Sequence, residues 1–233
     1  MTAHALRHLQ AWIAEGFHVV LILCVDDPTV FYPPDLASGS ASILVRANEG
    51  YDFAAWATAV LTTPGLSRAD FLITVNDSVF GPFNKFSEFI RRITGSEADY
   101  VGALESREIR PHYQSFLLGF SKTALQNKAF WSFWNGIRIG GRDFVINHYE
   151  VRMLDHMRRG GLTAEPVLAA PADGTNQTLN DWRGLLDAGF PYVKVQLLRD
   201  NPHGADLAAW RETFASRGYD PDIVDRYLAA LRD

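Results

Sequence analysis

Cysteine is nearly absent from this sequence, whose 233 residues include only Cys24. A single cysteine cannot form an internal disulfide, which is typical of proteins that work in a reducing compartment. Cys24 lies in the apolar run 19–25, and because free cysteines are usually buried, we expect it to be a small core residue. That run is far shorter than the roughly 20 apolar residues that a membrane-spanning helix needs.

Positive charge is also scarce, since 22 Lys and Arg residues stand against 27 Asp and Glu residues and give a net charge of −5. Proteins that bind nucleic acid use clustered Lys and Arg to replace phosphate counterions. The sequence has no basic stripe, so we expect no nucleic-acid partner. Its first residues do not combine basic and apolar regions as a signal peptide does, and we expect a cytoplasmic protein.

Several catalytic signatures are missing as well. The sequence contains no Cys/His metal cluster, no GxSxG elbow and no Walker-type phosphate loop, which excludes the zinc-site, hydrolase and kinase templates. His4 and His8 have the spacing of a metal pair, but no third ligand accompanies them. We therefore expect both histidines to be solvated on the surface of a helix.

Hydrophobic periodicity and turn residues predict alternating strands and helices. The expected strands are 18–25, 42–45, 70–75, 99–104, 115–120 and 164–168, and the expected helices are 3–15, 53–62, 83–93, 121–134, 144–159, 178–188, 204–217 and 221–232. This order predicts an α/β fold, with a mostly parallel sheet of Rossmann type covered by helices. We expect one domain over 1–233, in which 170–233 forms a helical C-terminal extension.

The chain begins on a predicted helix, whereas nucleotide-binding α/β folds usually begin with a central strand. We therefore expect the N-terminal first strand of such a sheet to be missing here.

The strand predicted at 70–75 ends abruptly on Asn76, Asp77 and Ser78, which Gly81 and Pro82 follow. In open α/β sheets the carboxyl ends of the strands line the ligand crevice. Asp77 could bind Mg²⁺, which takes one or two protein carboxylates and lets substrate phosphates complete its shell. The alternative is that Asp77 or Ser78 caps the next helix.

Three further polar segments, 46–53, 112–115 and 147–152, adjoin predicted strands or helices. Glu150 is the candidate general base for an acceptor hydroxyl, and the alternative is a surface glutamate paired with a nearby arginine. His112 is the competing base, with a packing role as its alternative.

Two other segments invite both structural and functional interpretations. Gly50 and Asp52 are either a left-handed turn and a helix cap or contacts to a base or ribose. The aromatic run 130–134 could stack on a sugar, but aromatic residues at this density usually build core.

Taken together, six motifs resemble the rhamnan synthesis protein F family, bacterial polysaccharide glycosyltransferases related to the GT-A fold. The motifs are, in order, RANEGYDFAAW at 46–56, NDSVFGP at 76–82, HYQSF at 112–116, AFWSFW at 129–134, YE at 149–150 and PYVKVQLLRDNP at 191–202. Each motif is weak alone, but six in this order are specific, and they cover nearly the whole chain.

The resemblance implies a GT-A-like fold and assigns roles to individual residues. The implied nucleotide-sugar contacts are Arg46, Asn48, Gly50, Asp52, Asn76, Asp77, Ser78 and Gln114, and the implied catalytic residues are Glu150 and, in competition with it, His112. Residues 76–78 occupy the place of the DxD metal motif, so Asp77 is the implied ligand for Mg²⁺ or Mn²⁺. Asn76 replaces the first carboxylate of that motif, and we expect the N-terminal strand that relatives carry to be missing.

The implied function is transfer of rhamnose, or a related sugar, with inversion from a nucleotide-sugar donor such as dTDP-rhamnose. The acceptor would be a cell-surface polysaccharide or a lipid-linked glycan, which places the protein in the cytoplasm or peripherally at the inner membrane. The alternative is a non-catalytic module that binds a sugar nucleotide or glycan, or a truncated subunit of a larger synthase.

Overall fold

The computed structural model describes residues 2–27, 29 and 41–231. Its largest sheet has the strand order β3-β7-β5-β6, and β8 pairs with β5. These strands are β3 (Phe71–Val75), β5 (Tyr100–Ser106), β6 (His112–Tyr113), β7 (Leu117–Ser121) and β8 (Ala164–Leu168). We call this the central sheet.

The prediction of a mostly parallel sheet is wrong, because the central sheet is mixed. β7 runs antiparallel to both β3 and β5, and only the β5–β8 pair is parallel. A parallel return needs a crossover of a dozen or more residues, usually a helix. The connection 107–116 holds only the short strand β6, so the chain comes back antiparallel.

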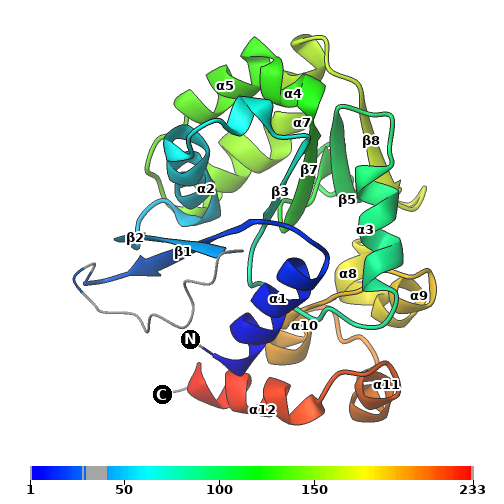
Figure 1. Cartoon of the computed structure of the whole chain (residues 1–233). Helices are drawn as coiled ribbons and strands as arrows, with labels where there is room; N and C mark the ends of the chain where they lie inside the picture. Colours follow the sequence, from blue (N-terminus) through cyan, green and yellow to red (C-terminus); the bar gives the residue numbers. More distant parts are fainter. Residues whose placement is uncertain (1, 28, 30–40, 232–233) are drawn as a thin grey trace.

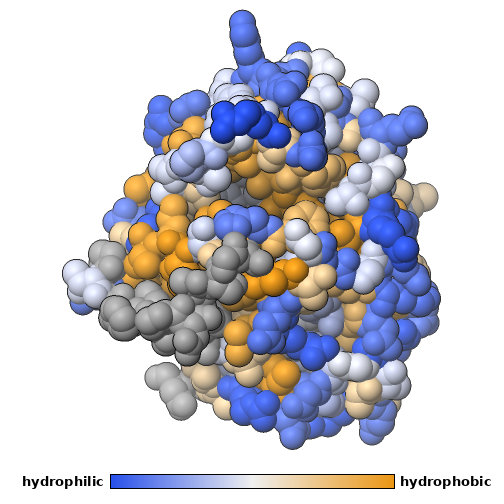
Figure 2. Space-filling model, in the orientation of Figure 1, coloured by the Kyte–Doolittle hydropathy of each residue, from blue (hydrophilic) through white to orange (hydrophobic). Residues whose placement is uncertain are grey.

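β1 (Val19–Val25) and β2 (Ala41–Ala47) form a separate parallel pair. Figure 1 shows this pair beside the central sheet, and Figure 2 shows apolar side chains at the surface in that region. The side chains of β1 are half-buried, and that of Cys24 is exposed. The prediction that Cys24 is a buried core residue is therefore wrong, because this pair, unlike the central sheet, does not cover its side chains fully.

Helices cover both faces of the central sheet (Figure 1). α3 (Phe86–Thr94) covers one face. The other face carries α2 (Tyr51–Thr62), α4 (Lys122–Gln126), α5 (Lys128–Asn135), α6 (Arg142–Val145), a π-helix (Ile146–Glu150) and α7 (Val151–Arg159). A 3₁₀ helix (Leu66–Arg68) precedes β3. Phe130 and Trp134 are fully buried in the core between these helices and the central sheet, where they lie near Phe120 of β7. The core interpretation of the aromatic run is therefore confirmed. The helix expected at 121–134 divides at Asn127, whose side chain caps α5.

The C-terminal third is mostly helical, as expected for 170–233. It contains α8 (Gln177–Asn180), α9 (Trp182–Asp187), α10 (Val195–Asp200), α11 (Trp210–Ser216) and α12 (Pro221–Ala230), and its short strand β9 (Val193–Lys194) pairs antiparallel with β4 (Val79–Phe80). No described helix combines the length and apolarity needed to cross a lipid bilayer.

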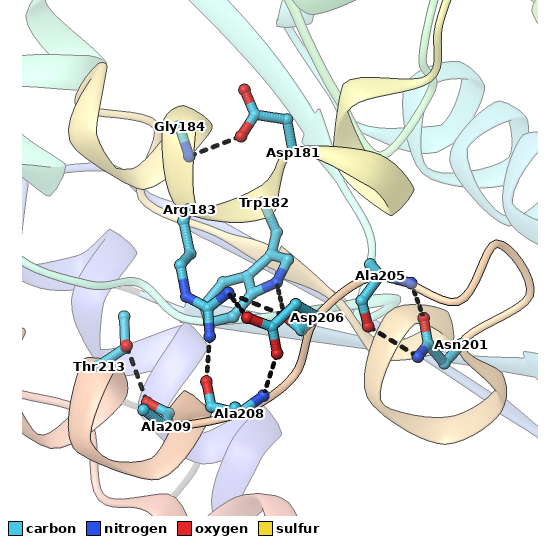
Figure 3. Close-up of polar contacts among 10 residues, drawn as sticks. All are labelled: Asp181, Trp182, Arg183, Gly184, Asn201, Ala205, Asp206, Ala208, Ala209 and Thr213. Carbon is cyan, nitrogen blue, oxygen red and sulfur yellow. Dashed lines mark hydrogen bonds and ion pairs between the residues drawn. The ribbon is translucent and has the colours of Figure 1, made fainter.

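The helix predicted at 204–217 begins only at Trp210. Figure 3 shows why: side chains hold the preceding loop in a non-helical path. Trp182 Nε1 and Arg183 donate to the carbonyl of Asp206 at 3.1 and 2.9 Å. The Asn201 side chain exchanges two hydrogen bonds with the backbone of Ala205, so these groups satisfy the backbone without a helix.

α1 (Ala3–Ala14) lies alongside α12, and its two histidines are buried rather than solvated as predicted. His8 Nε2 lies 3.1 Å from the Tyr192 hydroxyl, and His4 Nδ1 lies 3.3 Å from that of Tyr219. Burial lowers the pKa of His4 and lowers the pKa of His8 to about 3, so both are neutral near pH 7. The sequence prediction was wrong because the C-terminal region packs over this face of α1.

Candidate functional site

The residues after β3 form a tight turn instead of a helix cap. Asn76 Oδ1 accepts hydrogen bonds from the Ser78 amide at 3.1 Å and from the Ser78 hydroxyl at 2.6 Å. β4 follows at Val79, and α3 begins only at Phe86 without a side-chain cap. The capping alternative for Asp77 and Ser78 is therefore wrong, and both side chains are exposed at the end of the strand.

Asp52 lies beside this turn. Asn76 Nδ2 donates to Asp52 Oδ2 at 2.7 Å, which joins the first turn of α2 to the end of β3. Burial raises the pKa of Asp52, and the nearby charges of Asp77 and Glu150 raise it further against the opposing Asn76 hydrogen bond. Three carboxylates from different segments are thus close enough to interact.

Gly50 rather than Asp52 is the N-cap residue of α2, and it is left-handed with φ of 70°. A Cβ atom at Gly50 would lie 2.6 Å from the Cβ of Ala54. The turn expected at Gly50 is confirmed, whereas the expected cap at Asp52 is wrong. Asp52 uses its side chain on Asn76 instead.

Glu150 ends the π-helix and is half-buried. The Ser115 amide donates to Glu150 Oε1 at 3.1 Å, which fixes one carboxylate oxygen and leaves the other for a ligand. Among the described residues Glu150 forms no ion pair with the arginines of α7, so the surface-pair alternative is wrong. Single π-turns within helices occur frequently at functional sites.

Lys194, which sequence reasoning missed, completes this site. Burial lowers its pKa, while Glu150 and Glu108 oppose that shift, followed by Asp52. Its ammonium lies 5.2 Å from the ring centroid of Phe116. Lys194 is a lone lysine within the apolar stretch 191–195, and it lies in the motif quoted for 191–202; both were available signals. We call Asp52, Asn76, Asp77, Glu150 and Lys194 the central polar cluster.

Gln114 is buried next to this cluster in a polar network. Its Nε2 lies 3.4 Å from Asn176 Oδ1, and Asn176 Nδ2 donates to Glu108 Oε2 at 2.8 Å. Glu108 is in turn one of the charges that act on Lys194. Through Glu108, this network adds a second negative charge that acts on Lys194 besides that of Glu150.

His112 is buried in β6 and paired with Ser106. Its Nδ1 lies 2.8 Å from the carbonyl oxygen of Arg110. Because a carbonyl only accepts, Nδ1 carries the proton. This tautomer leaves Nε2 as an acceptor, and it is the burial of the ring that favours the packing alternative for His112 over the role of general base.

Arg46 and Asn48 lie at the end of the β1–β2 pair. Arg46 donates to the Glu49 carbonyl at 2.9 Å, and its second contact is Cys24 Sγ at 3.7 Å. The Asn48 amide donates to the Val25 carbonyl at 3.1 Å, while its side chain is exposed. The described contacts do not bring these two side chains to the central polar cluster.

The described residues contain no group of three or more His, Cys, Asp or Glu side chains with the geometry of a metal site. Asp77 nevertheless presents an exposed carboxylate beside Asp52. A single carboxylate suits Mg²⁺ when the phosphates of a substrate supply the remaining ligands. The donor chemistry here thus fits a cation held jointly with a diphosphate.

Comparisons with known proteins agree with the motifs. The family model described as rhamnan synthesis protein F matches residues 33–202. "Virulence protein VirA" of Vibrio anguillarum is 26% identical over 230 residues, which cover 83% of this chain and 73% of that protein. The uncharacterized protein y4gN of Sinorhizobium fredii is 27% identical over 137 residues, 56% of this chain and 36% of y4gN. No solved structure matches the chain.

Proposed function

Since the chain belongs to the rhamnan synthesis protein F family, we propose that it is a glycosyltransferase of cell-surface polysaccharide biosynthesis. It transfers rhamnose or a related sugar, with inversion, from a nucleotide-sugar donor such as dTDP-rhamnose. The acceptor is a polysaccharide or a lipid-linked glycan, and the protein works in the cytoplasm or peripherally at the inner membrane. Rhamnan synthesis, in the description of the family, supports a polysaccharide-related role.

The observation that carries this proposal is the convergence of the central polar cluster. Asp52, Asn76, Glu150 and Lys194 come from four separate segments, yet each interacts with another member of the set. Burying carboxylates and an amine together destabilises a fold unless opposite charges and hydrogen bonds compensate for the lost hydration. Such arrangements of perturbed groups are typical of functional sites.

In the proposed reaction Glu150 is the general base. The acceptor oxygen attacks the anomeric carbon of the donor sugar, Glu150 takes the hydroxyl proton, and the bond from that carbon to the diphosphate breaks. The Ser115 amide at 3.1 Å holds Glu150 Oε1, so Oε2 is available for the proton. A positioned base of this kind contributes typically 10²–10⁴-fold to the rate.

The departing diphosphate needs compensating positive charge. Lys194 supplies an ammonium within electrostatic reach of Glu150 and Asp52. Asp77 would hold Mg²⁺ or Mn²⁺, which supplies further charge neutralisation when bound. The Asn76–Ser78 turn and Gln114 shape the surroundings of the donor, and Arg46, Asn48 and Gly50 contact its nucleotide part in this proposal.

One observation favours the alternative of a non-catalytic sugar-nucleotide or glycan-binding module. The β1–β2 pair is separate from the central sheet, and the contacts of Arg46 point back to Glu49 and Cys24. A binding module needs the polar surface but no base aligned with an acceptor. Turnover of the donor separates the two functions.

The test measures sugar transfer from dTDP-rhamnose to a lipid-linked glycan acceptor, together with the donor-induced change in melting temperature with and without Mn²⁺. We expect Glu150→Gln to lower kcat by about 10²–10⁴-fold while donor binding remains. Glu212→Gln makes the same change at an exposed position on α11 and serves as the control. Full activity of Glu150→Gln refutes the assignment of the base, and donor binding without turnover in the unmodified protein supports the binding module.

A further inference from the structure

A polar hollow lies between α5, the π-helix and α7, and Glu150 does not line it. It is a half-open cavity of about 310 Å³. Its charged and titratable walls are Arg110, Arg152, Arg159, Asp155, His148 and His156. We call it the basic pocket.

The charge of the basic pocket is opposite to that of the whole chain. Three guanidinium groups and one carboxylate leave an excess of two positive charges, whereas the protein carries a net charge of −5. Only Arg110 is paired with Asp155, at 3.1 Å. Two arginines therefore face the cavity without a compensating carboxylate among the described residues.

The free donors of these two arginines are available to a ligand. Arg152 uses Nε on the Asn147 carbonyl at 3.0 Å, and no described group accepts from its terminal nitrogens. Arg159 makes no hydrogen bond or ion pair in the described part of the chain. A guanidinium group with free terminal nitrogens matches the oxygen geometry of phosphate.

The histidines are oriented by backbone carbonyls. His148 Nδ1 lies 3.0 Å from the Phe144 carbonyl oxygen, and His156 Nε2 lies 2.9 Å from that of Ala129. Because carbonyls accept, these nitrogens carry protons, and the opposite ring nitrogens are left for other partners. The rings are thus fixed rather than free to rotate.

The size and apolar floor of the basic pocket indicate more than a bare anion. Small-molecule sites are typically about 300–1,000 Å³ and combine apolar walls with a few polar groups. Phe133 and Tyr149 supply the apolar wall here, and the Tyr149 hydroxyl is already engaged with the backbone of Arg138. We propose that the basic pocket binds a phosphate monoester carried by a sugar-sized group, separately from the donor site.

The test measures binding of glucose 1-phosphate by isothermal titration calorimetry, with glucose and inorganic phosphate as partial ligands. Sedimentation with vesicles that contain phosphatidic acid asks whether the phosphate is instead that of a lipid headgroup. We expect the double variant Arg152→Gln, Arg159→Gln to weaken binding at least tenfold. Arg211→Gln with Arg226→Gln removes the same charge from α11 and α12 and should bind like the unmodified protein.

Lys194→Met distinguishes the basic pocket from the central polar cluster. Binding of glucose 1-phosphate that persists in Lys194→Met and falls in the Arg152, Arg159 variant supports the proposal, whether or not sugar transfer occurs. If the arginine variant loses binding to the phosphatidic acid vesicles but binds glucose 1-phosphate like the unmodified protein, the phosphate is that of a lipid headgroup. Loss of binding in Lys194→Met alone, or equal binding by all variants, overturns it.

Discussion

β1 and β5 are both seven-residue strands, but their burial is opposite to what their compositions suggest. β1 reads VVLILCV and has no fully buried residue, whereas β5 reads YVGALES, and six of its seven residues are buried. β5 has β7 and β8 as neighbours and helices over both faces, while β1 pairs with β2 in a separate two-stranded sheet. Layers of structure, rather than the hydrophobicity of a strand, determine how far it is buried.

This comparison also explains the position of the central polar cluster. Asp52 lies in the first turn of the helix that follows β2, and Asn76 directly follows β3 of the central sheet. Their hydrogen bond at 2.7 Å therefore ties α2, the helix that follows the half-buried β1–β2 pair, to the end of the well-packed central sheet. A donor site at this junction would use side chains from both.

The largest expected effect comes from the same deletion made in both regions. Leu118→Ala, in β7, should lower the free energy of unfolding by about 3–4 kcal/mol, because Leu118 is only 1% exposed and leaves a cavity. Leu23→Ala, in half-buried β1, should lower it by about 1 kcal/mol, because less apolar surface is lost. Urea denaturation at pH 7.5 measures both free energies of unfolding. Equal losses of stability in the two variants would contradict the difference in burial between β7 and β1.

The next effect concerns α1, which packs against the C-terminal region. Burial lowers the pKa of His8 to about 3, so the unfolded chain binds a proton below about pH 6.5 that the folded chain does not. Stability from His8 is present above that pH and decreases as pH falls, by about 2 kcal/mol between pH 8 and 5. His4 acts in the same direction.

Urea denaturation at pH 8, 6.5 and 5 measures this dependence. Because glutamine cannot titrate, His8→Gln should reduce the slope of unfolding free energy against pH by the amount that corresponds to about one proton. Leu23→Ala should lower the unfolding free energy at every pH without changing that slope. An unchanged slope in His8→Gln means that His8 does not provide the dependence.

A smaller effect is expected at the junction itself. Burial raises the pKa of Asp52, so its charged form destabilises the fold near neutral pH. Asp52→Asn keeps an acceptor for Asn76 and should increase stability by roughly 0.5–1 kcal/mol at pH 7.5, the lower end of the range for single stabilising substitutions. The gain should shrink at lower pH, where the carboxyl of the unmodified protein is protonated.

Melting curves at pH 7.5 and 4.5 compare the two proteins. Sugar transfer by Asp52→Asn should fall even as its stability rises. A loss of stability at both pH values would show that the charge of Asp52 stabilises the junction.

The smallest effect is expected at the rim of the central sheet. Lys122 Nζ lies 3.0 Å from Asp70 Oδ1, but both side chains are more than half exposed. Exposed ion pairs contribute little, so Lys122→Ala should leave the urea midpoint unchanged within error. A large shift of the urea midpoint would mean that the Lys122–Asp70 ion pair stabilises the rim of the central sheet.

The sequence predicted most helices and strands near their observed positions, because periodicity and turn residues act over a few neighbours. It did not predict the direction of β7, which depends on the short connection 107–116, or the short strands β4, β6 and β9. The single-domain organisation stays a prediction.

At the candidate site, the motifs identified Asp52, Asn76 and Glu150 as polar residues of interest, and the structure brings them together. Lys194 lies in the motif at 191–202 but was given no role, because nothing in that motif shows which distant carboxylates its side chain meets. The assignments of catalysis and metal binding to Glu150 and Asp77 remain proposals.

The sequence alone determined the local elements, the aromatic core of α5 and the family, since each depends on residues close together in the chain or on their order. Tertiary structure decided that His4 and His8 are buried, that Cys24 is exposed and that Glu150 lies near Lys194. Burial and long-range electrostatics depend on which distant segments cover or approach a residue. No local pattern contains that information.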